Sequence, residues 1–275
     1  MLERLYPEPA VRVAFLVLGF VLLVLVTCHA GAIVLDTMAP SDNTVILREF
    51  FSLNKEGNAP TWFSSLLFLL IGLSCGAIYF AERYAPLGSE LLRKTSPFWL
   101  LFSFMFIFLS FDETSQLHER LDWIMSGLSE GGRPSEASGD LASQQLPFYR
   151  YLLIYIPVLG ALGMAMAWFV IRRFQHPVSA LLFFIGMSCL AMKLMIESVE
   201  KWSLSMTWFG HKVYLEAVIV EMTCLFIGAI LIFTSLLNYL FRLLRSAFVL
   251  RTHQEMDQEV SESPRSQAFG SRSTV

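Results

Sequence analysis

Charged residues are scarce in this chain of 275 residues. Asp, Glu, Lys and Arg together make up 16% of the sequence, whereas hydrophobic residues make up 55%. One soluble core could not bury so much apolar surface, so we expect the lipid bilayer to surround most of the chain. The net charge of -3 and the scattered basic residues provide no basic face for nucleic acid, which we therefore do not expect as a partner.

Cysteines and the motifs of familiar catalytic sites are also scarce. The four cysteines each lie within an apolar run and none belongs to a CxxC pair, which indicates packed side chains rather than a disulfide framework or a zinc knuckle. The sequence contains no P-loop, no HExxH motif and no ExxH motif of the kind found in bundled di-iron sites. A function must therefore be inferred from individual polar residues.

Long apolar runs are what the sequence does contain. A helix that crosses the hydrocarbon core needs about 20 mostly apolar residues. The runs are continuous and lack the alternation of barrel strands, so the predicted fold class is all-α, a polytopic membrane protein with a six-transmembrane-helix bundle. The predicted spans are residues 13–35, 61–82, 98–118, 148–171, 178–200 and 213–240.

The segments outside the spans complete the predicted domain organisation. Residues 1–12 precede a transmembrane domain at 13–245, and the polar, Ser-rich residues 246–275 are predicted to form a disordered tail. Between the first two spans, residues 45–53 mix apolar and charged side chains and predict a helix at the membrane interface.

Basic residues beside the spans predict the orientation. By the positive-inside rule, both termini are expected to be cytoplasmic, and in a bacterium the chain would lie in the inner membrane. The loops expected outside are mainly acidic. The basic residues expected inside are Arg4, Arg12, Arg83, Arg93, Lys94, Arg172, Arg173, Arg242, Arg245 and Arg251.

Ionisable residues inside the spans carry most of the functional information, because charges at bilayer depth are costly and usually mark sites, pathways or buried pairs. Counted along the helices, one group lies roughly 20 to 25 Å from the inner boundary of the membrane core. A second group lies nearer the outer surface. The deeper group is His29, Asp112, Glu113, Lys193 and Glu221, and the outer group is His118, Glu119, Glu197, Glu200, Lys201, His211, Tyr214 and Glu216.

The deeper group has more carboxylates than cations. Where the dielectric constant is low, neighbouring carboxyl groups cannot all be ionised without a positive partner. A proton or a cation is therefore expected among them. Carboxylate and imidazole ligands suit Zn, Fe or Mn. The predicted ligands are Asp112, Glu113, His118, Glu119 and Glu221, and the residues predicted to support them are His29, Ser115, Lys193, Glu197, Glu200, His211 and Glu216.

Simpler interpretations stand beside this one. Lys193 with Asp112 or Glu221 could form only an ion pair between helices, and His29 could be a packed histidine. A structural or assembly subunit, with a membrane-protein partner or a second copy of the chain, is therefore one alternative. A metal-dependent hydrolase acting on a lipid is another, in which a metal-bound water attacks and a carboxylate acts as base.

Two resemblances bear on these alternatives. The stretch from Lys55 to Ser65, followed by Asp112-Glu113 and His118-Glu119, resembles a group of bacterial multi-pass membrane proteins of unknown activity. That resemblance runs over most of spans two to six and implies the same class and the same Asp/Glu/His cluster.

The chain is also similar to alkaline ceramidase and related membrane hydrolases, which hold a metal with histidines near a serine and an aspartate. This similarity implies such roles for Asp112, Ser115 and His118, with Ser64 or Ser65. The chain departs from that family in having six predicted spans rather than seven, and in lacking a paired HxxxH on a late helix.

Overall fold

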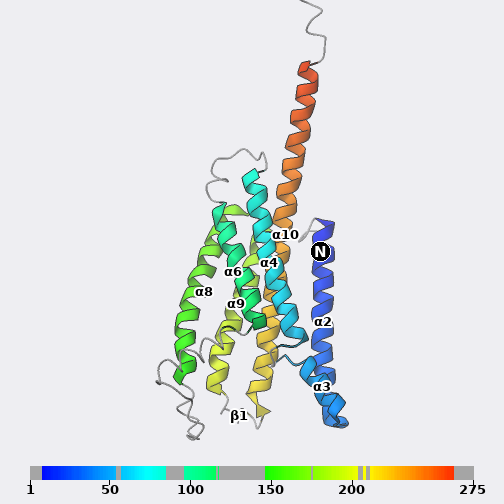
Figure 1. Cartoon of the computed structure of the whole chain (residues 1–275), viewed down its shortest axis with the longest axis vertical. Helices are drawn as coiled ribbons and strands as arrows, with labels where there is room; N and C mark the ends of the chain where they lie inside the picture. Colours follow the sequence, from blue (N-terminus) through cyan, green and yellow to red (C-terminus); the bar gives the residue numbers. More distant parts are fainter. Residues whose placement is uncertain are drawn as a thin grey trace, which may run out of the picture.

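The computed structural model describes residues 8–53, 57–84, 96–115, 117, 146–174, 176–203, 207–208 and 211–262. In these residues the chain forms a bundle of long helices (Figure 1). The helices are α2 (Pro9–Met38), α3 (Asp42–Phe50), α4 (Ala59–Tyr84), α6 (Pro97–Ser115), α8 (Leu146–Arg173), α9 (Pro177–Ser203) and α10 (Val213–Glu262). The predicted helical class is confirmed.

A short ribbon interrupts the helices between α9 and α10. Strands β1 (Thr207–Trp208) and β2 (His211–Lys212) pair antiparallel, with Trp208 opposite His211. The sequence pattern does not predict a strand there. His211, expected near the site, therefore belongs to a small hairpin at one end of the bundle.

Five helices of the described residues are long and apolar enough to cross a membrane: α2, α4, α6, α9 and α10. The remaining predicted span, residues 148–171, corresponds to α8, which is a helix of 28 residues but is not among these five. Helices long and apolar enough to cross a membrane are therefore confirmed, and the count of six stays a prediction. The predicted interfacial helix corresponds to α3, which begins with a capping box between Ser41 and Thr44.

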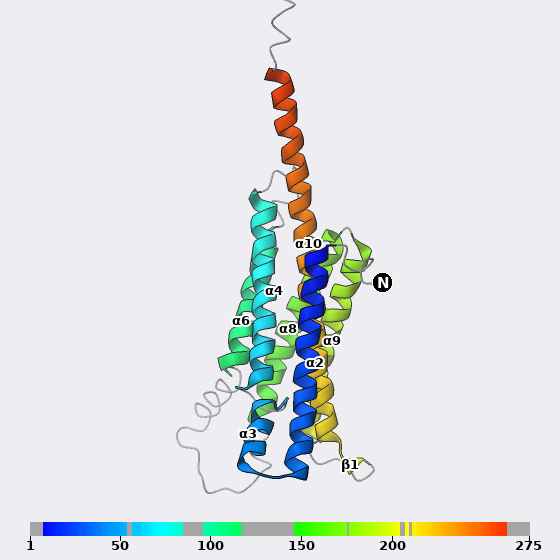
Figure 2. The same cartoon turned by 90° about the vertical axis from the view of Figure 1, so that its right-hand side faces the viewer.

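The last helix differs from the prediction. The tail was predicted to be disordered from residue 246, but α10 continues to Glu262 and extends beyond the rest of the bundle (Figures 1 and 2). At about 1.5 Å per residue, 50 residues make a helix of about 75 Å, which exceeds the thickness of a bilayer core. Residues 252–262 can extend this helix because Gln, Glu and Met have high helix propensities.

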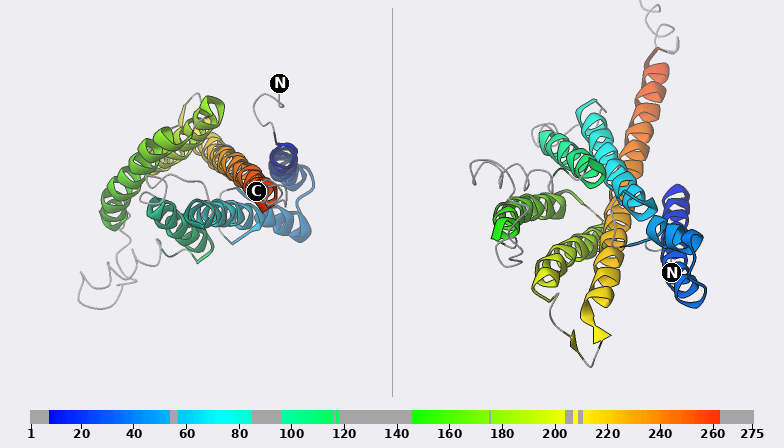
Figure 3. Two further views of the ribbon diagram at one scale, coloured as in Figure 1. Left: turned by 90° about the horizontal axis from the view of Figure 1, so that it is seen from above. Right: turned by 60° about the horizontal axis from the view of Figure 1, so that its bottom comes forward.

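We name the two ends of the bundle for what lies there. The α3 end holds α3, the first turn of α4 and the last turn of α6, and the tail end holds the last turn of α4 and the segment of α10 that projects outward (Figure 2). Seen along the bundle, α10 lies between α9 and α4, α6 packs beside α4, and α2 and α8 lie at opposite edges (Figure 3).

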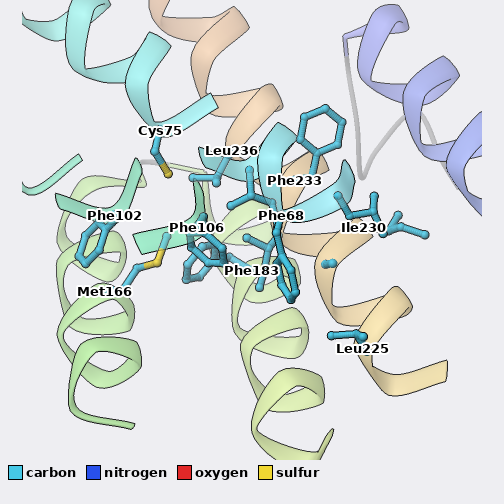
Figure 4. Close-up of a cluster of buried hydrophobic side chains, with 14 of the residues drawn as sticks. Phe68, Cys75, Phe102, Phe106, Met166, Phe183, Leu225, Ile230, Phe233 and Leu236 are labelled. Atoms are coloured by element: carbon cyan, nitrogen blue, oxygen red, sulfur yellow. The ribbon is translucent and has the colours of Figure 1, made fainter. Parts of the chain in front are cut away.

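The buried core lies mainly between α4, α6 and α10 and is dominated by phenylalanine and branched aliphatic residues. Figure 4 shows part of it, where α8 and α9 add Met166 and Phe183 to side chains from the other three helices. Lipid does not favour burial of apolar side chains in the way water does, so close packing must supply most of the attraction between helices. Close approach is greatest where glycines meet: an added Cβ at Gly186 would lie 2.8 Å from the carbonyl oxygen of Gly228.

Candidate functional site

Hydroxyl groups join α4 and α6 at the α3 end. Ser65 Oγ donates to the carbonyl oxygen of Ser110 at 2.8 Å and lies 3.0 Å from Ser110 Oγ and 2.8 Å from Thr114 Oγ1. Ser65 and Ser110 are both buried. In lipid, such groups must find partners within the protein, so these hydrogen bonds fix the two helices against each other.

Ser64 connects the same contact to a predicted ligand. Its Oγ donates to Oε1 of Glu113 at 2.7 Å and also lies 2.9 Å from the carbonyl oxygen of Thr61. Within the described part of the chain, no basic side chain pairs with Glu113. Its carboxylate is therefore stabilised by a neutral hydroxyl rather than by an opposite charge.

Asp112 lies on another side of α6. At about 100° per residue, Asp112 is nearly opposite Ser110 and Thr114, which face α4. Its exposed fraction is nevertheless only 6%, so it is buried on the side of α6 that faces away from α4. The two adjacent carboxylates, which the sequence places together, thus point to different surroundings.

A shallow groove of about 390 Å³ lies beside the hydroxyl contact. Three apolar residues, Leu69, Ile107 and Phe111, line it together with Ser110, Thr114 and Ser115. Ser115 Oγ is buried, and the described residues contain no hydrogen-bond partner for it. The groove is mostly apolar, so it resembles a lipid-facing surface more than a closed coordination site.

An N-terminal cap secures α4 at this end. Asn58 is 6% exposed, and its Oδ1 accepts from the backbone N of Thr61 at 3.2 Å and from Thr61 Oγ1 at 3.1 Å. Its Nδ2 donates to the carbonyl oxygens of Glu49 and Ser52. Asn58 therefore ties the segment after α3 to the helix that carries Ser64 and Ser65.

We expect Asn58→Ala to lower the free energy of unfolding by about 1 to 2 kcal/mol, because a buried cap with four hydrogen bonds is lost. Thermal unfolding of the purified protein in detergent, followed by tryptophan fluorescence, measures this change. Asn43→Ala, at an exposed position of α3, serves as the control and should change stability by less than about 0.5 kcal/mol. Equal effects of the two substitutions would contradict the assigned role of Asn58.

Lys193 and Glu221 form an ion pair between α9 and α10. Lys193 Nζ lies 3.4 Å from Oε1 of Glu221, and their side chains are 21% and 10% exposed. The predicted pairing of Lys193 with one of the deep carboxylates is thus found with Glu221. This pair neutralises Glu221 and leaves the carboxylates of α6 as the remaining acidic residues of the deeper group.

His29 lies at the edge of the bundle. It is 6% exposed on α2, and its imidazole contacts the backbone of Phe51 just after α3. Its Nδ1 is buried and has no hydrogen-bond partner in the described residues. This position favours the interpretation of His29 as a packed histidine.

Within the described residues, no group of three or more His, Cys, Asp and Glu side chains is placed to hold a metal ion. Several of the predicted site residues lie outside the described part of the structure, so this statement does not cover them. The side chains that lie outside the described part of the structure are those of His118, Glu119, Glu197, Glu200, His211 and Glu216.

The structure places a second polar cluster at the tail end, which the sequence analysis did not identify. Arg173 Nη2 lies 2.8 Å from Oε2 of Glu82, and Tyr239 donates from its hydroxyl to Oε1 of Glu82 at 2.8 Å. The side chains of Arg173 and Glu82 are 9% and 0% exposed. A buried carboxylate thus holds α4, α8 and α10 together.

Aromatic rings surround this ion pair. Tyr239 stacks on Phe174 with ring centroids 4.9 Å apart and lies 5.9 Å from the ring of Trp99. The Arg173 guanidinium lies 5.6 Å from the ring of Phe169. These rings exclude water from the pair, which strengthens its electrostatic attraction and makes an unpaired partner costly.

A smaller hydrogen-bonded chain lies where α9 begins. Asn238 Nδ2 donates to Ser179 Oγ at 2.7 Å, and Ser179 Oγ lies 3.5 Å from Nδ1 of His176. Burial lowers the pKa of His176 below its ordinary value, and the positive charge of Arg242 lowers it further. His176 is therefore expected to be neutral at pH 7 and able to accept the hydrogen bond.

Comparison with known proteins identifies the family but no activity. The family model described as Domain of unknown function (DUF8692) matches residues 15–239. The chain belongs to this family. The DUF8692 region runs from the first turns of α2 to Tyr239, so both the α6 carboxylates and the Glu82 cluster lie inside it, whereas the projecting segment of α10 lies beyond it.

No curated protein and no solved structure matches this member of DUF8692.

Proposed function

We propose that this DUF8692 chain is an integral membrane protein that binds a cation, either a metal ion or a proton, at Glu113 of α6 near the α3 end. The observation that carries the proposal is the hydrogen bond from Ser64 to Glu113. It holds a carboxylate at a contact between two apolar helices, where a neutral hydroxyl is its described partner. An ionised carboxylate there is costly, so binding of a proton or a cation would stabilise it.

The Lys193–Glu221 pair reduces the number of residues expected to bind the cation. Because Lys193 lies next to Glu221, Glu221 already has a positive partner and contributes less to the excess of negative charge. Glu113 is then the central group of the proposed site, because Asp112 points to different surroundings. In the metal version, His118 and Glu119 would supply the other ligands, and Zn, Fe or Mn would be the expected metal.

The positive-inside rule supports a location near the outer surface. Arg83, Arg172 and Arg245 belong to helix segments at the tail end, which would therefore face the cytoplasm. The α3 end would then face outward, and the proposed site would take its cation from that side.

We expect Glu113→Gln to abolish cation binding or weaken it at least about tenfold, because it removes the negative charge and keeps the shape. The full-length protein in lipid nanodiscs is analysed for bound Zn, Fe and Mn by mass spectrometry, and for a protonated carboxyl by its infrared C=O band at neutral pH. Glu255→Gln is the matched control, since Glu255 lies on the projecting part of α10 and pairs with Arg251.

The two readouts separate the versions of the proposal. A stoichiometric metal that Glu113→Gln removes supports the metal version, and a carboxyl band that Glu113→Gln removes supports the proton version. A wild-type protein with neither signal would contradict the proposed function.

The Lys193–Glu221 pair favours a second candidate, in which polar side chains only hold the helices together and the protein serves as a subunit of a membrane complex. This candidate requires no bound cation. Under it, Glu113→Gln would leave both readouts unchanged and would alter only the stability of the bundle.

A further inference from the structure

The described side chains of α8, at residues 157–173, pack most closely on the bundle at the C-terminal end of the helix. Among its side chains at residues 157–174, the buried ones begin at Met166 and continue with Phe169 and Val170, and Phe174 follows directly after the helix. Phe169 lies among three aromatic rings of α6, with centroid distances of 5.0 to 5.8 Å to Phe98, Trp99 and Phe102. The Glu82–Arg173 pair then fixes the last turn of α8 to α4.

The preceding part of α8 is attached less firmly. None of the residues 157–165 is buried, and Met164 is 71% exposed. Pro157 lies inside the helix, where it removes one backbone hydrogen bond and permits a bend. Gly160 follows, and an added Cβ there would meet no atom within 4 Å. Gly163 lies closer to α9, since an added Cβ there would be 3.2 Å from Met187, but residues 157–165 bury no side chain and are therefore less constrained by packing than the anchored end.

We infer that α8 is an arm that swings away from α6, and that the cluster of Glu82, Arg173 and Tyr239 holds it in the docked position. The two hydrogen bonds to Glu82 join three helices at one point, so breaking them removes a buried charged attachment of α8. Release of the arm would expose the aromatic face of α6 that Phe169 covers, formed by Phe98, Trp99 and Phe102. The inference concerns the movement of α8 and does not depend on cation binding at Glu113.

Distance measurements between α8 and α6 test this inference. Spin labels are attached through a keto amino acid at Met164 and Phe104, which are 71% and 65% exposed, so the four native cysteines remain in place. Distances are measured by pulsed electron paramagnetic resonance on the full-length protein in nanodiscs. We expect Arg173→Gln and Glu82→Gln to move the mean distance upward by more than the width of the wild-type distribution.

Two further variants complete the experiment. Arg172→Gln is the matched control, because Arg172 is exposed and lies over the ring of Trp168 at 4.1 Å rather than on Glu82. It should leave the distances unchanged. Tyr239→Phe keeps the ring stacked on Phe174 and removes only the hydroxyl, so it should broaden the distribution and still fold.

Folded Arg173→Gln and Glu82→Gln proteins with the wild-type distribution would overturn the inference, even if both had lost thermal stability. If those two variants fail to fold, Tyr239→Phe decides, and an unchanged distribution for Tyr239→Phe would overturn the inference as well. Loss or retention of the Glu113 cation signal does not enter this comparison.

Discussion

Gly228→Val is expected to separate α9 from α10 and to lower the free energy of unfolding by about 3 kcal/mol or more, at the upper end of the range for overpacked interiors. An added Cβ at Gly228 would lie 2.8 Å from the carbonyl oxygen of Gly186 and 3.1 Å from Cβ of Cys189. The first of these atoms belongs to the backbone and cannot rotate out of the way. The two helices must therefore move apart, which also lengthens the Lys193–Glu221 contact.

The control for this substitution is a glycine on another long apolar helix, with open space around it. An added Cβ at Gly31 on α2 would meet no atom within 4 Å. Gly31→Ala should therefore be neutral or stabilise by up to about 1 kcal/mol, because alanine favours helix over glycine. Gly228→Ala should instead destabilise the protein. Thermal unfolding in detergent measures both variants, and the two Gly→Ala substitutions should change stability in opposite directions. A stabilising Gly228→Ala would contradict the close contact between the helices.

The length and apolar character of the helices could be predicted from the sequence because they follow from local composition. Residues 61–82 and 178–200 were predicted as spans, and α4 and α9 extend only a few residues beyond those limits. The end of α10 was not predicted. A polar, Ser-rich composition indicates solvent exposure, but it does not distinguish a solvated helix from a disordered chain.

The deeper group of polar residues could be predicted only in part. Depth along each helix is a matter of counting, so the sequence places Glu113, Lys193 and Glu221 near one level. Which way each side chain points depends on helix rotation, and rotation is set by contacts such as Gly186 with Gly228. The structure therefore pairs Lys193 with Glu221 and places Glu113 beside Ser64, while Asp112 faces elsewhere.

The Glu82 cluster was missed because each member has an ordinary explanation in the sequence. Arg173 lies next to Arg172 and was assigned to the positive residues beside a span, and Glu82 is the last residue of a predicted span. One signal could have drawn attention to them. Glu82 is a carboxylate within a predicted span, and an ionisable residue there usually has a buried partner.

Removal of Arg173 is expected to destabilise the protein by about 3 to 5 kcal/mol, because it leaves a buried carboxylate without its cation. The Glu82 side chain is 0% exposed and lies inside the bundle, so it cannot reach water. Glu82→Leu should cost less than Arg173→Leu. The Arg173 side chain is long, 9% exposed and at the end of its helix, so without Glu82 it can extend toward the headgroups.

The double variant tests whether the two residues act on each other directly. Replacing both members of a buried pair by apolar residues is often neutral, so the Glu82→Leu, Arg173→Leu protein should be more stable than the Arg173→Leu protein. The four proteins form a cycle measured by thermal unfolding in one detergent, and a direct pair requires an interaction energy well above about 0.5 kcal/mol. Arg172→Leu is the control and should cost at most about 1 kcal/mol, since an exposed cation over a ring contributes little.

Additive losses in that cycle would mean that Arg173 stabilises α8 through Phe169 and the membrane surface rather than through Glu82. If the double variant recovers stability, the loss in the Arg173→Leu protein comes from the unpaired charge of Glu82 and not from the lost volume of either side chain. The double variant would then have a stable bundle without the charged attachment of α8, two properties that cannot be separated in the wild type. If α8 then moves freely in a stable protein, the ion pair sets the position of the helix, and the aromatic rings around it supply the stability.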